Sequence, residues 1–428
     1  MKYKKVLVIS NNGFSETSSN GRTLGNFFVG WPKDKLAQFC ISMSKPNFEI
    51  CNNYYVVTDY AAISAFTHVR KADRVPVSQA LNTEGTTSLN RNRSKRSVKT
   101  ASKAIVRNIV WSGKRWKSKE FKTWVEDFKP EVVLVVTSDS AFIHNIALDV
   151  AEERHIPIVM FCTEGFYFFK RSHMRVESFL DKISFPIYQH FYKRGFEKLM
   201  RRVSYAVYGN SKLESDYQSR FEHKSAVLYT SSSMPFCEDD VDADKPVFSY
   251  LGNFGFNRPK ALVEIAEVLK RIDDTYKLDV YGRVEQESVR NHLERCEAIS
   301  LKGFIPYSEV QNVINRSSIV FHGESQEPQF EESLKYGFTT KIADSIASGR
   351  CFLMYASREI AGAKYVLDTD AAWLAENKDE LEKQIREILT NKDVRLLKKE
   401  NARMLAQTNH NSDVNCRRFA EIVNSVSN

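Results

Sequence analysis

The arrangement of the apolar runs constrains the fold of this chain more than any other feature of its sequence. Short runs of β-branched and aromatic residues, each suited to one buried strand, alternate with segments that have a helical apolar period. In the first half of the chain these runs are residues 5–9, 54–57, 132–136, 156–161, 205–208 and 226–228. In the second half they are residues 247–251, 278–281, 318–321 and 351–354. The alternation predicts an α/β protein built on doubly wound parallel sheets.

The length of the chain, 428 residues, favours two domains over a single core. A polar and acidic segment without an apolar period, residues 231–246, separates the two series of strands. We therefore predict a Rossmann-like N-terminal domain over residues 1–230, a linker over 231–246, a second Rossmann-like domain over 247–405, and a helical tail over 406–428.

The composition narrows the cellular context. The seven cysteines are odd in number and never fall in a C-x-x-C pair, which argues against a disulfide framework or a zinc knuckle. No apolar stretch approaches the roughly 20 residues that cross a bilayer. The apolar run near the N-terminus is too short for a signal peptide. We expect a cytoplasmic protein.

The most informative motif spans residues 336–353, with the sequence YGFTTKIADSIASGRCFL. Thr339 or Thr340 can cap a helix that starts here. The free amides of a helix start, its dipole and the adjacent Lys341 suit a diphosphate. Asp344, one turn later, is placed to accept hydrogen bonds from a ribose diol. An ordinary capped helix that leads into a strand has the same pattern.

A second constellation is the strand-to-helix loop LGNFGFNRPK at residues 251–260. Its glycines let the backbone approach a ligand, and Arg258 and Lys260 offer cations near the same strand edge. Two weaker signals follow in order: Val-Tyr-Gly-Arg around Gly282, and the segment 302–310, which contains Ile305. A glycine-bearing loop without a ligand remains the alternative for each.

Taken together, these segments resemble retaining GT-B glycosyltransferases of the large bacterial family that builds cell-surface polysaccharides. Residues 336–353 resemble the family segment S-T-K-[IL]-x-E-x-x-x-x-G-x-P. The loop at 251–260 is similar to the one whose Arg and Lys neutralise the leaving diphosphate, and 302–310 resembles a turn that reads the nucleobase. The resemblance covers roughly residues 248–370 and implies two Rossmann-like domains facing each other across a cleft.

The resemblance also implies residue roles. Thr340, Lys341 and Asp344 would bind the donor diphosphate and ribose. The chain departs from the family pattern at two positions, because Asp344 replaces a glutamate and Tyr336 occupies the position of the family's first glutamate, eight residues earlier. The predicted donor-binding set is Gly21, Gly252, Asn253, Lys260, Gly282, Ile305, Tyr336, Thr339, Thr340 and Asp344.

In the N-terminal half, Asn12 and Gly13 follow the first strand, and Gly21 and Arg22 open a helical pattern. A loop at the carboxyl end of a strand is a ligand position in α/β sheets. The family uses a comparable glycine-bearing loop to meet the phosphates and the acceptor, which implies an acceptor role for Asn12, Gly13 and Arg22. A turn loop without a ligand is the alternative.

Three further groups of ionisable residues are candidates for chemistry. Glu164 follows another strand and would hold an acceptor hydroxyl or merely solvate its loop, so the predicted catalytic set is Arg258, Lys341 and Glu164. His144 is expected on the surface. The acidic residues from Glu324 to Glu332 are expected to form a solvated loop, because their spacing fits no metal site, and we expect no metal.

The formal net charge of +9 is concentrated in residues 91–119, which contain many Lys and Arg and no acidic residue. Apolar residues recur on one helical face of this stretch: Val98, Ala101, Ile105 and Ile109. Trp111 and Trp116 suit a lipid headgroup layer, and a second basic-aromatic zone covers 168–194. We predict docking on an anionic membrane surface, the alternative being a solvated basic loop beside a buried aromatic helix. We expect no nucleic-acid partner, because no recognition motif accompanies the charge.

The predicted function is transfer of a sugar from a nucleoside-diphosphate sugar to a glycan or lipid-linked acceptor, with retention of the anomeric configuration and without a cofactor. Two alternatives stay open: a nucleotide-sugar epimerase on the same fold, and a catalytically silent membrane-associated scaffold. The fold alone does not choose among them.

Overall fold

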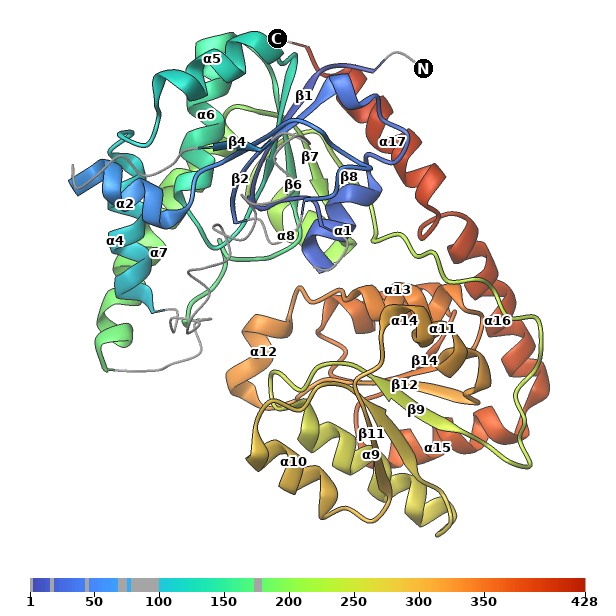
Figure 1. Cartoon of the computed structure of the whole chain (residues 1–428). Helices are drawn as coiled ribbons and strands as arrows, with labels where there is room; N and C mark the ends of the chain where they lie inside the picture. Colours follow the sequence, from blue (N-terminus) through green and yellow to red (C-terminus); the bar gives the residue numbers. More distant parts are fainter. Residues whose placement is uncertain are drawn as a thin grey trace. The chain divides into compact units, whose positions relative to one another are not determined.

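The computed structural model describes residues 3–15, 19–42, 46–67, 75–77, 100–172 and 179–427. The chain divides into two compact units. The first unit comprises Met1–Leu228 together with Asn415–Asn428, and the second comprises Tyr229–Val414. Each unit contains its own sheet with helices packed against it (Figure 1).

The sheet of the first unit has the strand order β4-β3-β2-β1-β5-β6-β7-β8. Its strands are β1 (Val6–Asn12), β2 (Leu36–Ser42), β3 (Tyr54–Val56), β4 (Val75–Val77), β5 (Val132–Val136), β6 (Ile158–Cys162), β7 (Val203–Tyr208) and β8 (Ser225–Val227). All neighbours pair in parallel except β3 and β4. The strand order reverses between β1 and β5, which is the point where ligands bind in such sheets.

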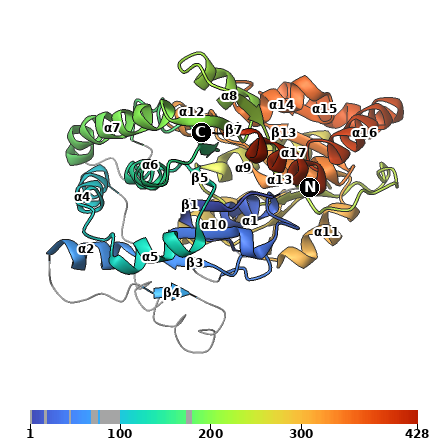
Figure 2. The same cartoon turned by 90° about the horizontal axis from the view of Figure 1, so that it is seen from above.

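Helices complete the first unit. They are α1 (Ser19–Asn26), the short η1 (Lys33–Lys35), α2 (Asp59–Thr67), α4 (Ala101–Ser112), α5 (Lys119–Phe128), α6 (Phe142–Arg154), α7 (Phe179–Met200), α8 (Ser211–Gln218) and α17 (Ser412–Ser425). Helices α4, α6 and α7 pack against one another, and Figure 2 shows them side by side.

The last helix returns to the core of the first unit. Phe419 of α17 stacks on Phe27 with ring centroids 5.2 Å apart, and the thiol of Cys416 donates to the carbonyl oxygen of Asn26 at 2.7 Å. Phe419 is fully buried in the same apolar cluster as strand β1. The segment 406–428, predicted as a separate tail, therefore includes a helix that belongs to the packing of the first unit.

The sheet of the second unit is entirely parallel, with the order β11-β10-β9-β12-β13-β14. Its strands are β9 (Phe248–Leu251), β10 (Leu278–Tyr281), β11 (Ile299–Gly303), β12 (Ile319–Gly323), β13 (Cys351–Tyr355) and β14 (Trp373–Ala375). Its helices are α9 (Arg258–Ile272), α10 (Glu287–Glu294), α11 (Tyr307–Arg316), α12 (Pro328–Leu334), α13 (Thr340–Ala347), α14 (Ala361–Thr369), α15 (Lys378–Thr390) and α16 (Lys392–Gln407). The two doubly wound sheets predicted from the sequence are confirmed.

The segment 231–246 contains no helix or strand, as a linker would. It is nevertheless attached to the second unit. The hydroxyl of Ser232 donates to Asp344 at 2.6 Å, and Asp240 forms an ion pair with Arg395 at 2.7 Å. Tyr229, just before this segment, packs on Tyr365 of α14.

Three aromatic side chains of the first unit lie elsewhere than expected. His144 is completely buried in α6 against Tyr192 and Phe196, so its expected surface position is wrong. Burial lowers the pKa of His144 to about 3, which keeps its ring neutral. Trp111 and Trp116 are also buried, so neither is available to a lipid headgroup layer. They fill the core because burial removes the large apolar surface of each indole ring from water.

Candidate functional site

The predicted donor site lies at the carboxyl edge of the second sheet. There the strand order reverses between β9 and β12, which lie next to each other although their sequence positions are far apart. The loop after β9 carries Asn253 and leads to Arg258, the first residue of α9. The chain after β12 begins with Glu324. Parallel pairing therefore brings these two loops together at the position where α/β sheets bind ligands.

A buried ion pair joins the two loops. The guanidinium of Arg258 donates to both carboxylate oxygens of Glu324, with its Nε at 2.8 Å and its Nη2 at 2.7 Å, and its Nη1 donates to Asn253. The ring Nε2 of His322 lies 2.8 Å from the same carboxylate. Arg258 is 5% exposed and Glu324 is 3% exposed. This bidentate pair fixes the position of both loops.

The pKa of Glu324 shows how strongly its charge is held. Burial by itself would raise the pKa of this carboxyl, but the hydrogen bond and charge of His322 and then the charge of Arg258 hold it at about 2. Since an ionised carboxylate only accepts, the proton of the His322 ring lies on Nε2. The expectation of a solvated acidic loop is wrong for Glu324, which is buried because it neutralises Arg258.

Lys341 is a further cation near the Arg258–Glu324 pair. It follows Thr340 in the first turn of α13, and none of the described residues forms an ion pair or hydrogen bond with its ammonium group. Partial burial, and then the positive charge of Arg258, lower the pKa of Lys341 to about 8. An ammonium group that lacks a counter-ion at a helix N-terminus is suited to bind an anion.

The start of α13 has no side-chain cap. Thr339 is the N-cap residue, yet its hydroxyl accepts no helix amide, and its buried Oγ1 has no hydrogen-bond partner among the described residues. Thr340 lies next to it and is partly buried. A helix start without a cap leaves backbone amides for a ligand. The sequence predicted an amide-lined site here, and the geometry is compatible with it.

Asp344 and Tyr336 lie on the inner side of this segment. Asp344, in the second turn of α13, is buried, and its Oδ1 accepts the hydrogen bond from Ser232. Tyr336 is buried as well, at 2% exposure, and the ammonium group of Lys335 lies over its ring. The predicted contacts of Asp344 with a ribose and of Tyr336 with the donor therefore stay predictions.

Two glycines allow the strand ends to approach each other. A Cβ atom on Gly282, after β10, would lie 2.2 Å from the carbonyl oxygen of Gly252, and one on Gly252 would lie 2.3 Å from the hydroxyl of Tyr250. Both distances are too short for any side chain. Ile305 follows β11 at the same sheet edge, and Lys260 faces Glu327, with its Nζ 3.2 Å from the Glu327 carboxylate. The structure thus places the predicted residues of the second unit along one edge.

The carboxyl edge of the first sheet carries a separate polar network. The side-chain amide of Asn11, in β1, donates to Ser138 at 2.7 Å and to Ser140 at 3.1 Å, both of which follow β5. Glu164 follows β6, and solvent reaches its side chain. The surrounding protein nevertheless displaces part of its water, and this desolvation, with the negative charge of Asp139, raises the pKa of Glu164 to about 7. A carboxyl with this pKa is matched to proton transfer near neutral pH.

The remaining predicted residues of the first unit lie near β1. Asn12 is exposed at the end of β1, and the amide of Gly13 donates to the carbonyl oxygen of Ser42 at 3.0 Å. Gly21 is buried in α1, and Arg22 beside it is partly exposed. Their predicted roles stay predictions.

The sequence predicted no role for His322 or Asp139, and it predicted a solvated position for Glu324. A signal existed for Glu324 and Asp139, because each follows a buried strand at its carboxyl end. The partner that makes Glu324 functional, Arg258, lies 66 residues away, and no local pattern reveals it.

Comparisons with known proteins give a family-model match over part of the chain and the fold of the whole. Residues 258–421 match the family model described as glycosyl transferase-like. Among solved structures, sucrose-phosphate synthase from Thermosynechococcus elongatus superimposes with a TM-score of 0.61 at 10% identity, covering 98% of both chains. HepE from Anabaena, solved in complex with UDP, has a TM-score of 0.61 at 11% identity, covering 99% of this chain and 100% of its own. The chain has the GT-B fold.

The match extends to a third GT-B structure, the lipopolysaccharide outer core galactosyltransferase WaaB, with a TM-score of 0.59 at 12% identity over 98% of this chain and 99% of that one. No curated protein matches the sequence at a significant level. The GT-B fold and the glycosyltransferase assignment predicted from the sequence are confirmed. Within the described ranges, no helix is both long and apolar enough to cross a membrane, and no group of three His, Cys, Asp or Glu is placed to hold a metal ion.

Proposed function

We propose that this GT-B protein transfers a sugar from a nucleoside-diphosphate sugar to a glycan or lipid-linked acceptor in surface polysaccharide biosynthesis. The observation that carries the proposal is the ammonium group of Lys341, which has no ion-pair partner among the described residues, at a helix start that no described side chain caps, beside the Arg258–Glu324 pair. A diphosphate that leaves a sugar carries developing negative charge, which this arrangement is suited to stabilise.

The two cations of the site have different tasks in this proposal. Because both carboxylate oxygens of Glu324 accept hydrogen bonds from Arg258, most of the charge of that guanidinium is already compensated. Lys341 therefore provides the net positive charge for the diphosphate. Arg258 acts mainly by holding the loop with Asn253 and the chain after β12 in place.

The ligands bound to a structural neighbour suggest the donor nucleotide. HepE was solved with UDP and with UDP-glucose. We propose UDP as the nucleotide that the second unit of this chain binds. Titration calorimetry with UDP and GDP on the full chain tests this, with Lys341→Met as the binding variant and Lys383→Met, at an exposed position of α15, as the matched control. Binding of UDP that Lys341→Met removes and Lys383→Met keeps supports the proposal.

Acceptor activation is proposed for Glu164 in the first unit. Its pKa of about 7 lets it accept the proton of an acceptor hydroxyl near neutral pH. Retention of the anomeric configuration is proposed from the sequence resemblance alone. Nuclear magnetic resonance of the first product formed distinguishes retention from inversion. Transfer that needs the acceptor separates a transferase from an epimerase, which would change the donor without one.

Transfer is further proposed to need neither a metal ion nor a cofactor. The ammonium group of Lys341 and the amides of α13 supply the positive charge that a divalent ion gives to other enzymes of phosphate chemistry. Equal transfer rates in magnesium and in excess EDTA are expected. A rate that EDTA abolishes and magnesium restores contradicts this part.

Docking on an anionic membrane is proposed for the first unit, through α7. This helix exposes an apolar row at helical spacing: Phe179, Leu180, Ile183, Ile187 and Phe191. Basic residues flank the row, and the two acidic residues of α7, Asp181 and Glu197, are buried or partly buried. Apolar side chains beside Lys and Arg, without exposed acids, are typical of surfaces that bind anionic lipid.

Vesicle sedimentation tests this surface. Ile183 and Ile187 are 54% and 48% exposed, so Ile183→Asp and Ile187→Asp leave the core intact. Both variants are expected to lose binding to vesicles that contain anionic phospholipid. Leu397→Asp, at an exposed position of α16 in the second unit, is the matched control. Binding that is equal for neutral and anionic vesicles, or for all variants, contradicts the proposal. Val98, which the sequence analysis placed on the apolar face of the basic stretch, lies outside the described residues.

A further inference from the structure

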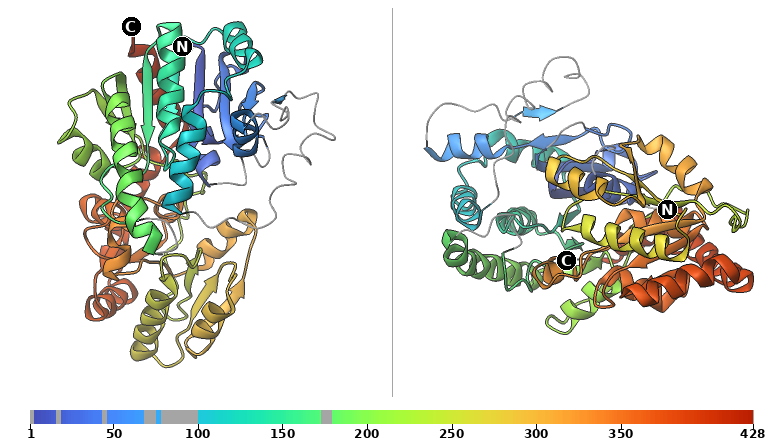
Figure 3. Two further views of the ribbon diagram at one scale, coloured as in Figure 1. Left: turned by 90° about the vertical axis from the view of Figure 1, so that its left-hand side faces the viewer. Right: turned by 90° about the horizontal axis from the view of Figure 1, so that it is seen from below.

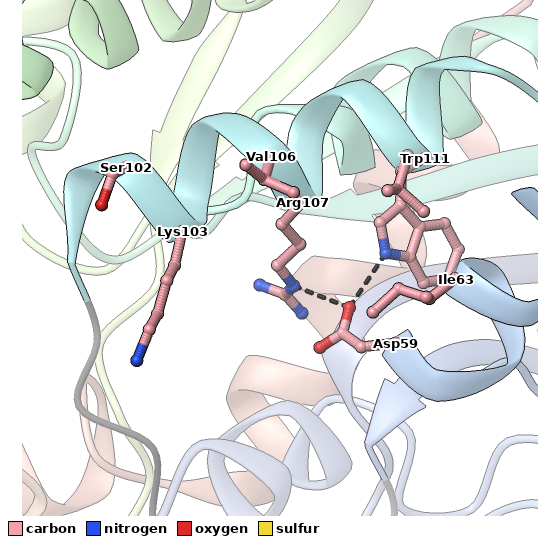
Figure 4. Close-up of a pocket in the computed structure, with 8 residues that line it drawn as sticks. Asp59, Ile63, Ser102, Lys103, Val106, Arg107 and Trp111 are labelled. Atoms are coloured by element: carbon pink, nitrogen blue, oxygen red, sulfur yellow. Dashed lines mark hydrogen bonds and ion pairs between the residues drawn. The ribbon is translucent and has the colours of Figure 1, made fainter. Parts of the chain in front are cut away.

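A pocket of about 440 Å³ opens in the first unit between α2 and α4 (Figure 4). It shares no lining residue with the Lys341 site, and Glu164 does not line it. The lining residues that the structure describes come from these two helices: Asp59, Ile63, Ser102, Lys103, Val106, Arg107, Val110 and Trp111.

The pocket combines an apolar wall with a basic end. Ile63 and Val106 are 49% and 60% exposed, although both are aliphatic and lie in a recess. Figure 4 shows Lys103 on the first turn of α4, one turn before Arg107. Among the lining residues that the structure describes, Lys103 and Arg107 are basic and Asp59 is acidic. A ligand that fits has an apolar part and an anionic group.

The polar side of the pocket is rigidly built. Asp59 Oδ1 accepts hydrogen bonds from Arg107 Nε at 2.7 Å and from Trp111 Nε1 at 2.9 Å. The indole of Trp111 also stacks on Phe142 of α6, with ring centroids 4.7 Å apart. Asp59 thus orients Arg107 and neutralises part of its charge, and a ligand anion would meet a preorganised guanidinium.

Arg107 links the pocket to the carboxyl edge of the first sheet. Its Nη1 donates to the hydroxyl of Ser140 at 2.7 Å, and Ser140 also accepts from Asn11 of β1. Ser140 adjoins Asp139, whose charge acts on Glu164. A ligand held at Arg107 is therefore linked through Ser140 and the adjoining Asp139 to Glu164, the residue that we propose for acceptor activation.

The apolar wall continues into the proposed membrane surface. Val106 and Ile109 lie on the outer face of α4, both more than half exposed. Helix α4 packs along α7, and the left view of Figure 3 shows the two side by side. An apolar chain that leaves the pocket over Val106 would reach these aliphatic side chains and cover them from water.

We propose that this pocket binds the phosphate and the first apolar segment of a lipid-linked phosphate acceptor. Arg107 and Lys103 would hold the phosphate, and Ile63 and Val106 would contact the lipid chain. The inference rests on the proposed function, because it assigns the acceptor class of the same enzyme. It adds a binding site in the first unit that neither the sequence motifs nor the donor site contains.

Calorimetric titration of the full chain with farnesyl phosphate tests the proposal, with inorganic phosphate and farnesol as separate arms. The variants are Lys103→Glu and Val106→Asp, both at exposed positions. The matched controls are Lys122→Glu on α5 and Val29→Asp after α1, which are exposed elsewhere in the first unit. Farnesyl phosphate is expected to bind at least about tenfold more tightly than either separate part, since each half of the pocket contributes. Both pocket variants are expected to weaken it by about tenfold or more, and the controls are expected to leave it unchanged.

Three results overturn the proposal: farnesyl phosphate does not bind, all four variants bind it equally, or inorganic phosphate binds as tightly as farnesyl phosphate. UDP binding, measured on the same samples, separates this inference from the proposed function. Intact UDP binding without farnesyl phosphate binding removes the acceptor pocket and keeps the donor site. The opposite result removes the donor proposal and keeps the pocket.

Discussion

Proton uptake on UDP binding is the sharpest consequence of the Lys341 environment. Partial burial and the nearby Arg258 hold the pKa of Lys341 at about 8 in the free protein. A bound diphosphate would place negative charge beside the ammonium group and raise this pKa toward its ordinary value of about 10.4. Because the pKa is higher in the complex, binding takes up a proton, and it is favoured by lower pH.

The size of the effect follows from the two pKa values. At pH 7 about 0.9 of the free Lys341 is already charged, so binding takes up only about 0.1 proton. At pH 8.5 only about a quarter is charged, so uptake rises to roughly 0.7 proton. The affinity for UDP should fall about fourfold between these two pH values, which is about 0.8 kcal/mol.

Calorimetry in two buffers of different ionisation enthalpy measures the uptake directly. The wild-type chain is expected to take up the additional proton at pH 8.5, and Lys341→Met is expected to lose the pH-dependent part with most of the affinity. Lys383→Met serves as the control that keeps both. Uptake that is the same at the two pH values in the wild-type chain, or that persists in Lys341→Met, refutes the assignment of the diphosphate to Lys341.

Three further predictions concern the loops around the sheet edges. Glu324→Ala should lower the free energy of unfolding of the second unit by about 3–5 kcal/mol, because it leaves Arg258 buried and unpaired. The double variant Arg258→Met/Glu324→Met removes both charges, so its loss of unfolding free energy, measured by urea unfolding, should be smaller. Glu164→Gln should lower the rate of transfer while UDP binding is kept. The wild-type rate should fall as the pH drops below about 7, where the raised pKa of this carboxyl leaves it protonated. If the rate of the variant falls below pH 7 in the same way, the assignment of Glu164 is contradicted. Gly282→Ala should displace the loop at Gly252, since the added Cβ would lie 2.2 Å from its carbonyl oxygen, and UDP binding at native levels in a folded variant contradicts the close approach.

The sequence by itself determined the class of fold and the local character of the donor segment. A buried strand and an amphipathic helix each have a period that a short window of residues reveals, so the alternation of the two was visible. The start of α13 was visible for the same reason, because Thr339, Thr340 and Lys341 are consecutive and their role depends on one helix end.

Only the tertiary structure decided which of the charged residues act together. Arg258 and Glu324 meet because β9 and β12 pair in parallel, and the energy of that pair depends on burial that no short window encodes. The return of α17 to Phe27 and the recess between α2 and α4 arise in the same way, from contacts between segments that lie far apart in the sequence. Periodicity describes one element at a time, whereas a site forms where several elements pack together.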